Sequence, residues 1–357
     1  MSGRDAIEAE PLPARADAVR AGPPPGTQDL LFEAARRLRR CEAALAKRFE
    51  QHGFAEVIPP AIERAEVFEA AAPVGPAEGA PAPGALRTVD RSGHLLALRA
   101  DFTAQVARIA ATRLAGVSPL RLYYRGSVVR ESAAEGGEPR ERLQAGCELV
   151  GAGGPEADAE MIALANASLH ALGIPAGTAR LSVGTVAWFA ALLRAAGTGE
   201  RLSRALSDAV DRKDLPTLTR LCEREVAPGK AREALLSLAR PPVLHAGAAS
   251  LLAQARALAP SEAAVAALDR LQAALADAKV RGVAAELEVD LGEVRGLGYY
   301  TGLVFNLYVA GAARAVGGGG RYDTLLGRFG DPRPAVGFSL DLDALVPLAH
   351  PEEPSPC

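Results

Sequence analysis

Residues 120–130, LRLYYRGSVVR, and residues 143–150, LQAGCELV, decide the fold class of this 357-residue chain. The first stretch contains two tyrosines and two valines, and the second is mostly apolar and ends in a valine, so each predicts a strand. The polar segment 131–141 between them contains Glu-Gly-Gly-Glu at residues 135–138 and is predicted to be a loop. Strands joined in this way form a hairpin, so we expect an antiparallel sheet.

Further strands are predicted on both sides of a long helical stretch. They cover residues 54–58, 95–98, 181–183, 286–291, 301–309, 313–316 and 335–340. Between the third and the fourth, residues 186–280 carry almost only helical periodicity. Strand-rich blocks around a helical stretch predict one α+β domain, an antiparallel sheet flanked by helices with a helical insertion over about 186–280.

Helices are also predicted outside the insertion. They cover residues 30–51, 103–114, 156–170, 320–329 and 341–348, with Asp29 as a possible cap of the first. The Pro- and Gly-rich segment 71–85 is predicted to be a loop. We therefore divide the chain into a flexible N-terminal arm at 1–23, a core domain at 24–348 and a tail at 349–357.

Composition excludes several classes of protein. Forty Lys and Arg residues against 43 Asp and Glu give a net charge of -3, which opposes a sequence-independent nucleic-acid binder. The four cysteines lie far apart, so neither a metal site nor a disulfide framework is expected, and no cofactor is implied. We recognise no secretory signal and no apolar run long enough to span a membrane, so we expect a cytoplasmic protein.

Asp101 and Thr103 stand where a predicted strand passes into a predicted helix. The simpler interpretation is that Asp101 is a helix N-cap, a common position for Asp. The functional interpretation is that the carboxylate and the hydroxyl together bind the ammonium group of a ligand.

Arg130, Gln144 and Glu148 place polar groups on the two strands of the predicted hairpin. Gln144 and Glu148 are four residues apart and therefore share one face of their strand. The simpler interpretation is that these polar side chains belong to a strand face exposed to solvent. The alternative is a polar floor that binds a small zwitterion, with Glu taking the cation and Arg the carboxylate or a phosphate.

Two glycine-rich segments follow predicted strands near the C-terminal end. Tyr299 and Tyr300 lie among glycines in RGLGYYTG, residues 295–302, where a turn with aromatic packing is the simpler interpretation. The run Gly317–Gly320 can be a tight turn. It lacks both the GxGxxG order and a Walker Lys-Ser/Thr, which opposes Rossmann and P-loop folds.

Taken in order, six segments resemble the catalytic core of histidyl-tRNA synthetase. They are LRADFT (98–103), YRGSVVR (124–130), QAGCE (144–148), RGLGYYTG (295–302), GGGRYD (318–323) and VGF (336–338). The resemblance spans residues 24 to 348 and implies a class II aminoacyl-tRNA synthetase-like core. It also implies a histidine pocket made by Asp101, Thr103, Arg130, Gln144, Glu148, Arg295, Tyr299 and Tyr300.

The departures from that family bear on activity. Ala344 stands where the synthetase has the Arg that clamps ATP, and Asp341 and Asp343 add negative charge there. Losing a charge-assisted phosphate contact costs about 1.5–3 kcal/mol. Asp101 replaces the family's Glu, and Gly298 replaces an Asp. No anticodon-binding domain is expected after Leu348.

With these departures, the chain resembles the regulatory subunits of ATP phosphoribosyltransferase. The resemblance implies a non-catalytic protein of histidine biosynthesis that dimerises and joins a short catalytic subunit in a hetero-octamer. It further implies activation of that subunit, feedback inhibition by histidine, and no tRNA or membrane partner. Two alternatives stay open: a truncated synthetase that still activates histidine, and a synthetase-like binding module that serves another partner.

Overall fold

The computed structural model describes residues 22–71, 84–131, 139–294 and 300–351. Most of the predicted arm, loop 71–85, loop 131–141 and tail therefore lies outside the described residues, and the division into domains stays a prediction. Within the described ranges, no helix combines the length and the apolar character that a membrane span requires.

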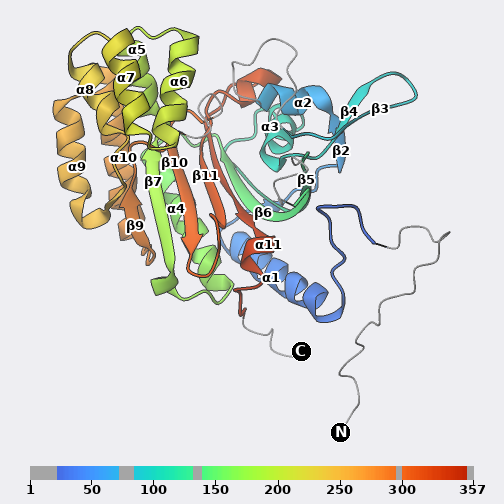
Figure 1. Ribbon diagram of the computed structural model, residues 1–357. Helices are drawn as coiled ribbons and strands as arrows, with labels where there is room; N and C mark the ends of the chain where they lie inside the picture. The colour runs from blue at the N-terminus through green and yellow to red at the C-terminus, as the bar shows by residue number, and fades with distance from the viewer. Residues whose placement is uncertain (1–21, 72–83, 132–138, 295–299, 352–357) are drawn as a thin grey trace.

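A nine-stranded sheet forms the centre of the molecule (Figure 1). Its order is β1 (Ala55–Glu56), β5 (Leu120–Val129), β6 (Glu141–Val150), β12 (Ala335–Asp341), β11 (Gly317–Arg321), β10 (Leu303–Val309), β7 (Ala179–Thr185), β9 (Glu286–Val289) and β8 (Val243–Leu244). A separate three-stranded sheet contains β2 (Ile62–Arg64), β4 (Leu95–Leu98) and β3 (Arg87–Val89).

The large sheet is mixed, so the expectation of an antiparallel sheet is correct for its centre and wrong near its edges. All neighbours from β5 to β7 along the sheet pair antiparallel, including the predicted hairpin of β5 and β6. However, β1 pairs parallel to β5, and β7 parallel to β9. Parallel neighbours require a long crossover connection. The chain between β7 and β9, mostly residues 186–280, is such a crossover.

That crossover contains most of the helices. They are α5 (Val186–Ala195), α6 (Glu200–Asp211), α7 (Leu215–Glu225), α8 (Lys230–Ser237), α9 (His245–Ala257) and α10 (Glu262–Val280). We call residues 186–280 the helical insertion. It also contributes β8, which pairs with β9 at the sheet edge, so it is not purely helical.

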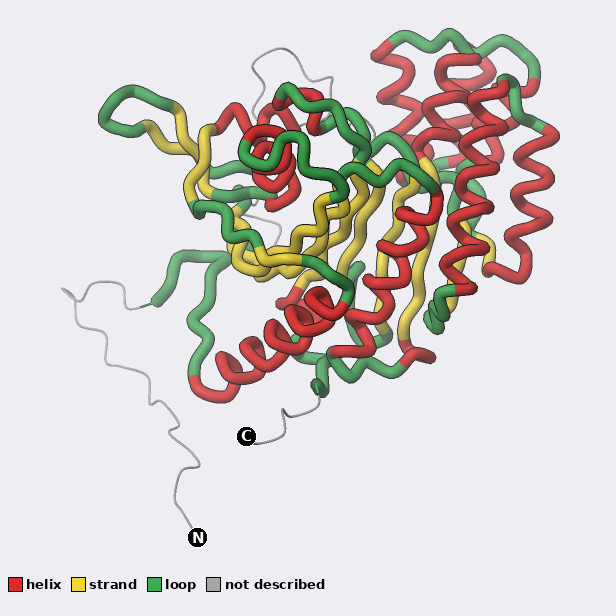
Figure 2. The backbone as a smooth tube through the Cα atoms, turned by 180° about the vertical axis from the view of Figure 1, so that it is seen from behind, coloured by secondary structure: helices red, strands yellow, loops and turns green. Residues whose placement is uncertain are grey.

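Three long helices, α1 (Phe32–Gln51), α4 (Pro155–Ala171) and α10, cover one face of the sheet (Figure 2). Their apolar faces pack on the strands, as with Phe49, which is fully buried against Tyr123 and Phe338. Burying one such side chain stabilises the fold by about 1.5–3 kcal/mol. Asp29 is not the cap of α1, because this helix begins after Leu31 and has no side-chain cap.

On the opposite face lies α3 (Phe102–Thr112), which follows β4 and packs against β5 and β6. A short helix, α2 (Ala65–Ala71), packs beside it. The region between α3 and the helical insertion therefore leaves part of the sheet's face available for a site.

The glycine run forms a central strand, not the tight turn considered from sequence. β11 lies between β10 and β12, where the strands approach closely. A Cβ atom on Gly319 would lie 2.1 Å from the Gly337 carbonyl oxygen, and one on Gly318 would lie 2.8 Å from the Phe305 oxygen. Glycine is needed at these positions because no side chain fits.

Three predictions in this C-terminal region are wrong. Residues 313–316 are outside any strand. The predicted helix 320–329 shrinks to the 3-10 turn η2 (Leu326–Phe329), because its first residues continue β11. The last helix, α11, covers only Leu342–Leu345.

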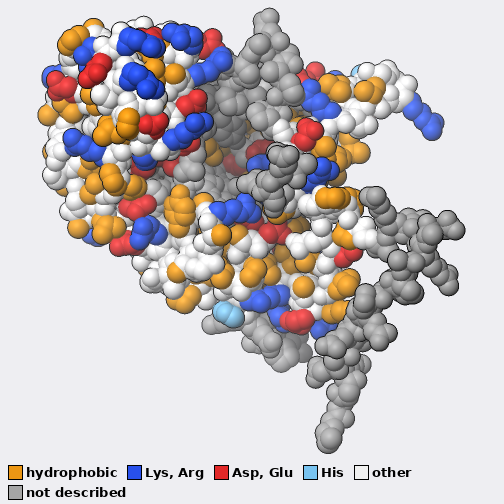
Figure 3. Space-filling model, in the orientation of Figure 1, with side chains coloured by type: hydrophobic (Ala, Val, Ile, Leu, Met, Phe, Trp, Pro, Cys, Tyr) orange, Lys and Arg blue, Asp and Glu red, His pale blue; other side chains and the backbone are white. Residues whose placement is uncertain are grey.

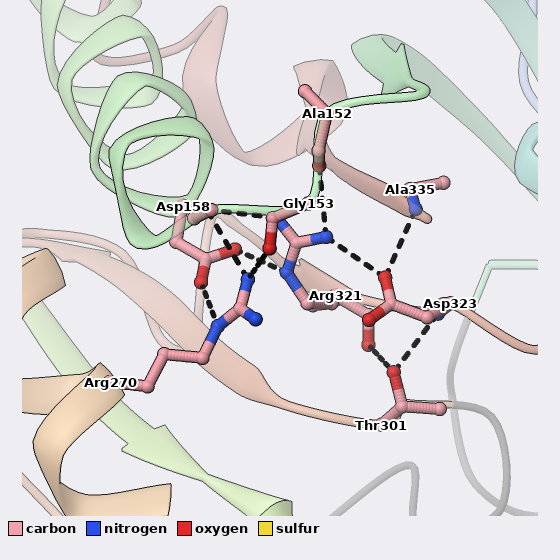
Figure 4. A network of polar contacts seen from close by, with 9 residues as sticks. Ala152, Gly153, Asp158, Arg270, Thr301, Arg321, Asp323 and Ala335 are labelled. Atoms are coloured by element: carbon pink, nitrogen blue, oxygen red, sulfur yellow. Dashed lines mark hydrogen bonds and ion pairs between the residues drawn. The ribbon is translucent and has the colours of Figure 1, made fainter. Parts of the chain in front are cut away.

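A buried ion pair joins the end of β11 to α4 (Figure 4). Arg321 is 1% exposed and donates from Nε to Asp158 Oδ1 at 2.6 Å, and from Nη1 to the Ala152 oxygen and Asp323 Oδ1 at 3.1 and 2.9 Å. Asp158 Oδ2 accepts from Arg270 Nε of α10 at 2.9 Å. One carboxylate therefore connects the sheet, α4 and the helical insertion.

Replacing Arg321 with Met should destabilise the protein by about 3–5 kcal/mol, because the buried Asp158 carboxylate loses one of its two cations. Urea unfolding measures the loss. Arg36→Met is the control: it breaks an exposed pair with Glu33, which water and salt screen, so this variant should lose little stability. Equal losses in the two variants would contradict a special role for the buried pair.

Candidate functional site

Glu148 lies at the centre of the candidate site, on β6 between Leu122 of β5 and Gly337 of β12. It is 1% exposed. Thr103 Oγ1 donates to Glu148 Oε1 at 2.7 Å, and the Tyr124 hydroxyl reaches the same oxygen at 3.4 Å. The Tyr322 hydroxyl donates to Oε2. Hydroxyl groups from α3, β5 and the end of β11 thus surround one buried carboxyl group.

Two glycines make room for this arrangement. A Cβ atom on Gly337 would lie 1.6 Å from Glu148 Oε2, and one on Gly146 would lie 2.5 Å from the Tyr124 hydroxyl oxygen. The Tyr124 ring in turn stacks on Phe102 of α3, with ring centroids 4.3 Å apart. Close packing against Gly337, and of Tyr124 against Gly146 and Phe102, therefore fixes the position of the Glu148 carboxyl group.

Burial, with a smaller contribution from the nearby Asp101 carboxylate, raises the pKa of Glu148 to about 8. The hydrogen bonds from Thr103 and Tyr322 act in the opposite direction, because they stabilise the ionised form. Near neutral pH, the carboxyl group consequently carries a proton that it can share with a basic ligand.

Asp101 is the N-cap of α3, as the simpler interpretation predicted: its Oδ1 accepts from the Ala104 backbone nitrogen at 3.0 Å. Its other oxygen lies 4.0 Å from Arg130 Nη2. Arg130 Nε also donates to the Ala100 carbonyl oxygen at 2.9 Å, which holds the guanidinium beside this helix start. Capping leaves one carboxylate oxygen facing the Arg130 charge, so both interpretations of Asp101 are compatible.

A polar pocket of about 460 Å³ adjoins this group, and we call it the ligand pocket. Of the predicted site residues, Arg130, Gln144 and Tyr300 line it. The other polar side chains of the lining belong to Arg142, Glu293, Asn306, Arg314, Ser339 and Asp341, and three glycines of β11 contribute to the wall. Three arginines and two acids make the pocket suitable for a small zwitterion rather than an apolar molecule.

Tyr300 connects the pocket to Glu148 electrostatically. Burial raises its pKa well above the ordinary range, and the carboxylates of Asp101, Glu148 and Glu293 raise it further. Its hydroxyl is therefore a neutral hydrogen-bonding group.

The structure thus brings together Thr103 with Glu148, Asp101 with Arg130, and Arg130 with Gln144 and Tyr300. Arg295 and Tyr299, predicted for the same site, lie outside the described residues. Their part in ligand binding stays a prediction.

Sequence reasoning missed Tyr124 and Tyr322 as site residues, although both lie in motifs that carry the resemblance. Tyr124 donates to Glu148 from β5, and Tyr322 from the position directly after β11. Alternation places Tyr124 on the same face of β5 as Leu122, the residue opposite Glu148, but this signal requires the strand register. Glu293, 6% exposed in the pocket wall, was also missed.

The acidic residues near Ala344 have structural partners. Asp341 caps α11 by accepting from the Ala344 nitrogen at 3.1 Å, and Arg314 Nη2 lies 2.7 Å from its other oxygen. Asp343 accepts from the Leu143 nitrogen at 2.7 Å and from Gln28 Nε2 at 3.1 Å. Asp341 lines the pocket, whereas Asp343 ties α11 to β6 and to the segment before α1.

Comparisons with known proteins agree on one family. The family model described as histidyl-tRNA synthetase matches residues 26–345. An ATP phosphoribosyltransferase regulatory subunit from Anaeromyxobacter dehalogenans (strain 2CP-1) is 42% identical over 326 residues, which cover 90% of this chain and 89% of the relative. One from Geobacter metallireducens is 38% identical over 330 residues, covering 92% and 74%.

A solved structure shares the architecture. It is titled an ATP phosphoribosyltransferase regulatory subunit/histidyl-tRNA synthetase from Bacillus halodurans, and it superposes with a TM-score of 0.82 at 27% identity. The match covers 93% of this chain and 84% of that one. The class II histidyl-tRNA synthetase-like fold expected from the motifs is therefore confirmed.

The free energy of unfolding should fall as pH rises from about 5 to about 8. An ordinary Glu has a pKa of about 4.3, so in this range folded Glu148 retains a proton that the unfolded chain releases. Glu148→Gln cannot ionise and should show a smaller fall. Urea titrations of both proteins at pH 5 and pH 8 measure the difference, and parallel pH dependences would argue against the raised pKa.

Proposed function

Since this chain belongs to the family of ATP phosphoribosyltransferase regulatory subunits, which share the histidyl-tRNA synthetase fold, we propose that it activates a short catalytic phosphoribosyltransferase and binds the histidine that inhibits it. Family membership makes the chain a regulatory subunit of histidine biosynthesis and not itself the catalytic enzyme. The activation, the histidine and the assembly are the proposal.

One observation supports histidine above other ligands: a buried, protonatable Glu148 beside the Asp101–Arg130 pair. Histidine carries an ammonium group, a carboxylate and an imidazole whose ordinary pKa is about 6.5. An acid with a pKa near 8 is suited to share a proton with such a ring.

We assign the ligand groups as follows. Asp101 and Thr103 bind the ammonium group, and Arg130 or Arg295 binds the carboxylate. Glu148, with Tyr299 or Tyr300, contacts the imidazole. Gln144 lines the ligand pocket together with Arg130 and Tyr300, and supplies an amide that can donate and accept.

We propose that the chain acts as a homodimer within a hetero-octamer and makes no use of tRNA. The net charge of -3 opposes phosphate binding. Over the helical insertion, Lys and Arg side chains are interspersed with Asp and Glu (Figure 3). A tRNA surface would instead carry a continuous basic stripe.

Glu148→Ala should weaken histidine inhibition of the reconstituted phosphoribosyltransferase complex by about ten- to a hundredfold, because the ligand's imidazole is left without its buried hydrogen-bonding partner. The measurement is activity against histidine concentration, with each complex normalised to its own uninhibited rate. Lys279→Met, which changes an exposed side chain of the helical insertion, should leave the curve in place. An unmoved curve for Glu148→Ala in an assembled complex would place the feedback site elsewhere.

A synthetase that still adenylates histidine is the alternative that the fold itself suggests. We expect the purified protein to show no histidine-dependent exchange of pyrophosphate into ATP, because Ala344 offers no cation to the phosphates and Asp341 adds a carboxylate to the pocket. An authentic histidyl-tRNA synthetase assayed in parallel is the positive control. Robust exchange by this protein would restore the synthetase hypothesis.

A further inference from the structure

Lys213 connects the helical insertion to the turn that follows β9. It lies between α6 and α7, and its Nζ donates to Asp290 Oδ1 at 2.8 Å and to the Leu238 carbonyl oxygen at 3.3 Å. Only 31% of the Lys213 side chain and 10% of the Asp290 side chain are exposed, so water screens this pair weakly. The Lys213 backbone has a φ of +52°, an uncommon conformation for a non-glycine residue.

Asp290 closes the turn made by residues 290–293. Its Oδ1 also accepts from the Gly292 backbone nitrogen at 2.8 Å. Its own backbone nitrogen donates to the Val183 oxygen of β7 at 3.0 Å, and its carbonyl oxygen accepts from the Glu293 nitrogen at 3.2 Å. One carboxylate thus binds both the insertion's cation and the turn's own backbone.

Close packing holds the turn on two sides. A Cβ atom on Gly292 would lie 2.2 Å from the Leu238 oxygen and 2.5 Å from Lys213 Nζ. On the side of β7, a Cβ atom on Gly184 would lie 2.3 Å from the Asp290 oxygen. A displacement of the insertion at Lys213 or Leu238 must therefore be followed by the turn.

The turn delivers Glu293 to the wall of the ligand pocket. Glu293 Oε2 accepts from Asn306 Nδ2 at 2.8 Å, and both residues line the pocket. The Glu293 carboxylate also acts on Tyr300, whose pKa it helps to raise. Two contacts therefore separate a lysine of the insertion from a ligand-facing side chain.

We propose that Lys213 is a positioning residue: its ion pair with Asp290 holds the 290–293 turn and, through Glu293 and Asn306, sets the affinity of the pocket. This inference rests on the proposed binding of histidine in the pocket. The inference assigns a function to the helical insertion, because a displacement of the insertion at Lys213 would change the ligand affinity of the pocket. By linkage, the ligand changes the insertion with the same free energy.

Calorimetry with L-histidine on the full chain tests the proposal. Lys213→Met keeps the aliphatic length but removes the charge, and should raise the dissociation constant by roughly three- to thirtyfold. Lys213→Arg should restore most of the affinity, because a cation again reaches Asp290. Lys279→Met, an exposed lysine of the same insertion, is the matched control and should bind as the wild type does.

A double variant guards against failure to fold. Lys213→Met leaves the largely buried Asp290 carboxylate without its cation, which can destabilise the chain. Lys213→Met with Asp290→Asn removes that stranded charge while the link stays broken, so it should still bind histidine as weakly as the single variant. Wild-type affinity in a folded Lys213→Met or in the double variant would overturn the proposal.

Hydrogen exchange without ligand separates this inference from the proposed function. Peptides from residues 286–294 and 300–309 should exchange faster in Lys213→Met than in Lys279→Met, because the turn and its neighbours open more often. If the wild type binds no histidine, the proposed ligand is wrong. The hydrogen-exchange comparison then tests by itself whether Lys213 holds the 290–293 turn. Equal exchange in the two variants would then refute the role of Lys213.

Discussion

The buried ion pair of Arg321 and Asp158 is the interaction on which the core and the site both depend. Placing two charges in the interior costs several kcal/mol for each ion, so the pair is tolerable only with complete hydrogen bonding. Arg321 obtains it from Asp158, Asp323 and the Ala152 carbonyl, which hold the end of β11 against α4. Because Tyr322 is the next residue, the same anchor positions the hydroxyl that donates to Glu148.

Glu148 is a second buried acid, and the groups that offset the cost of its burial differ from those around Asp158. Within the part of the chain that the structure describes, its hydrogen-bonding partners are hydroxyl groups rather than cations, so burial dominates and its pKa rises. Burial also raises the pKa of Asp158, but the two guanidinium groups on either side of this carboxylate oppose that effect. The first arrangement leaves an acid that can respond to a basic ligand, and the second an acid held in an ion pair with two arginines. A regulatory site needs the former, and a stable scaffold the latter.

The segment around α11 shows how a synthetase-like fold can serve regulation. Asp341 caps α11 and pairs with Arg314, and Asp343 accepts a hydrogen bond from the backbone of β6. These carboxylates therefore stabilise the end of the sheet. The helical insertion, which bridges two parallel strands, is joined to the pocket wall through Lys213 and Asp290. On our proposals, this gives the ligand pocket two connections to the rest of the chain, one through β11 and one through the insertion.

Local periodicity and motif order determined much of this protein. The strand at 95–98 and the helix at 156–170 match β4 and, within one residue at each end, α4, because side-chain spacing is a property of the segment itself. The order of the motifs identified Asp101, Thr103 and Glu148, which the fold brings to one place. Their role in binding histidine is still to be tested.

Tertiary structure alone decided the remainder. The glycines of β11 form a strand because they pair with both β10 and β12, which lie too close to leave room for side chains. The hydroxyls of Tyr124 and Tyr322 meet Glu148 only through the register of strands far apart in the chain. The pKa of Glu148 likewise depends on the burial that these strands create together. Such effects arise between distant segments, so no local pattern of residues encodes them.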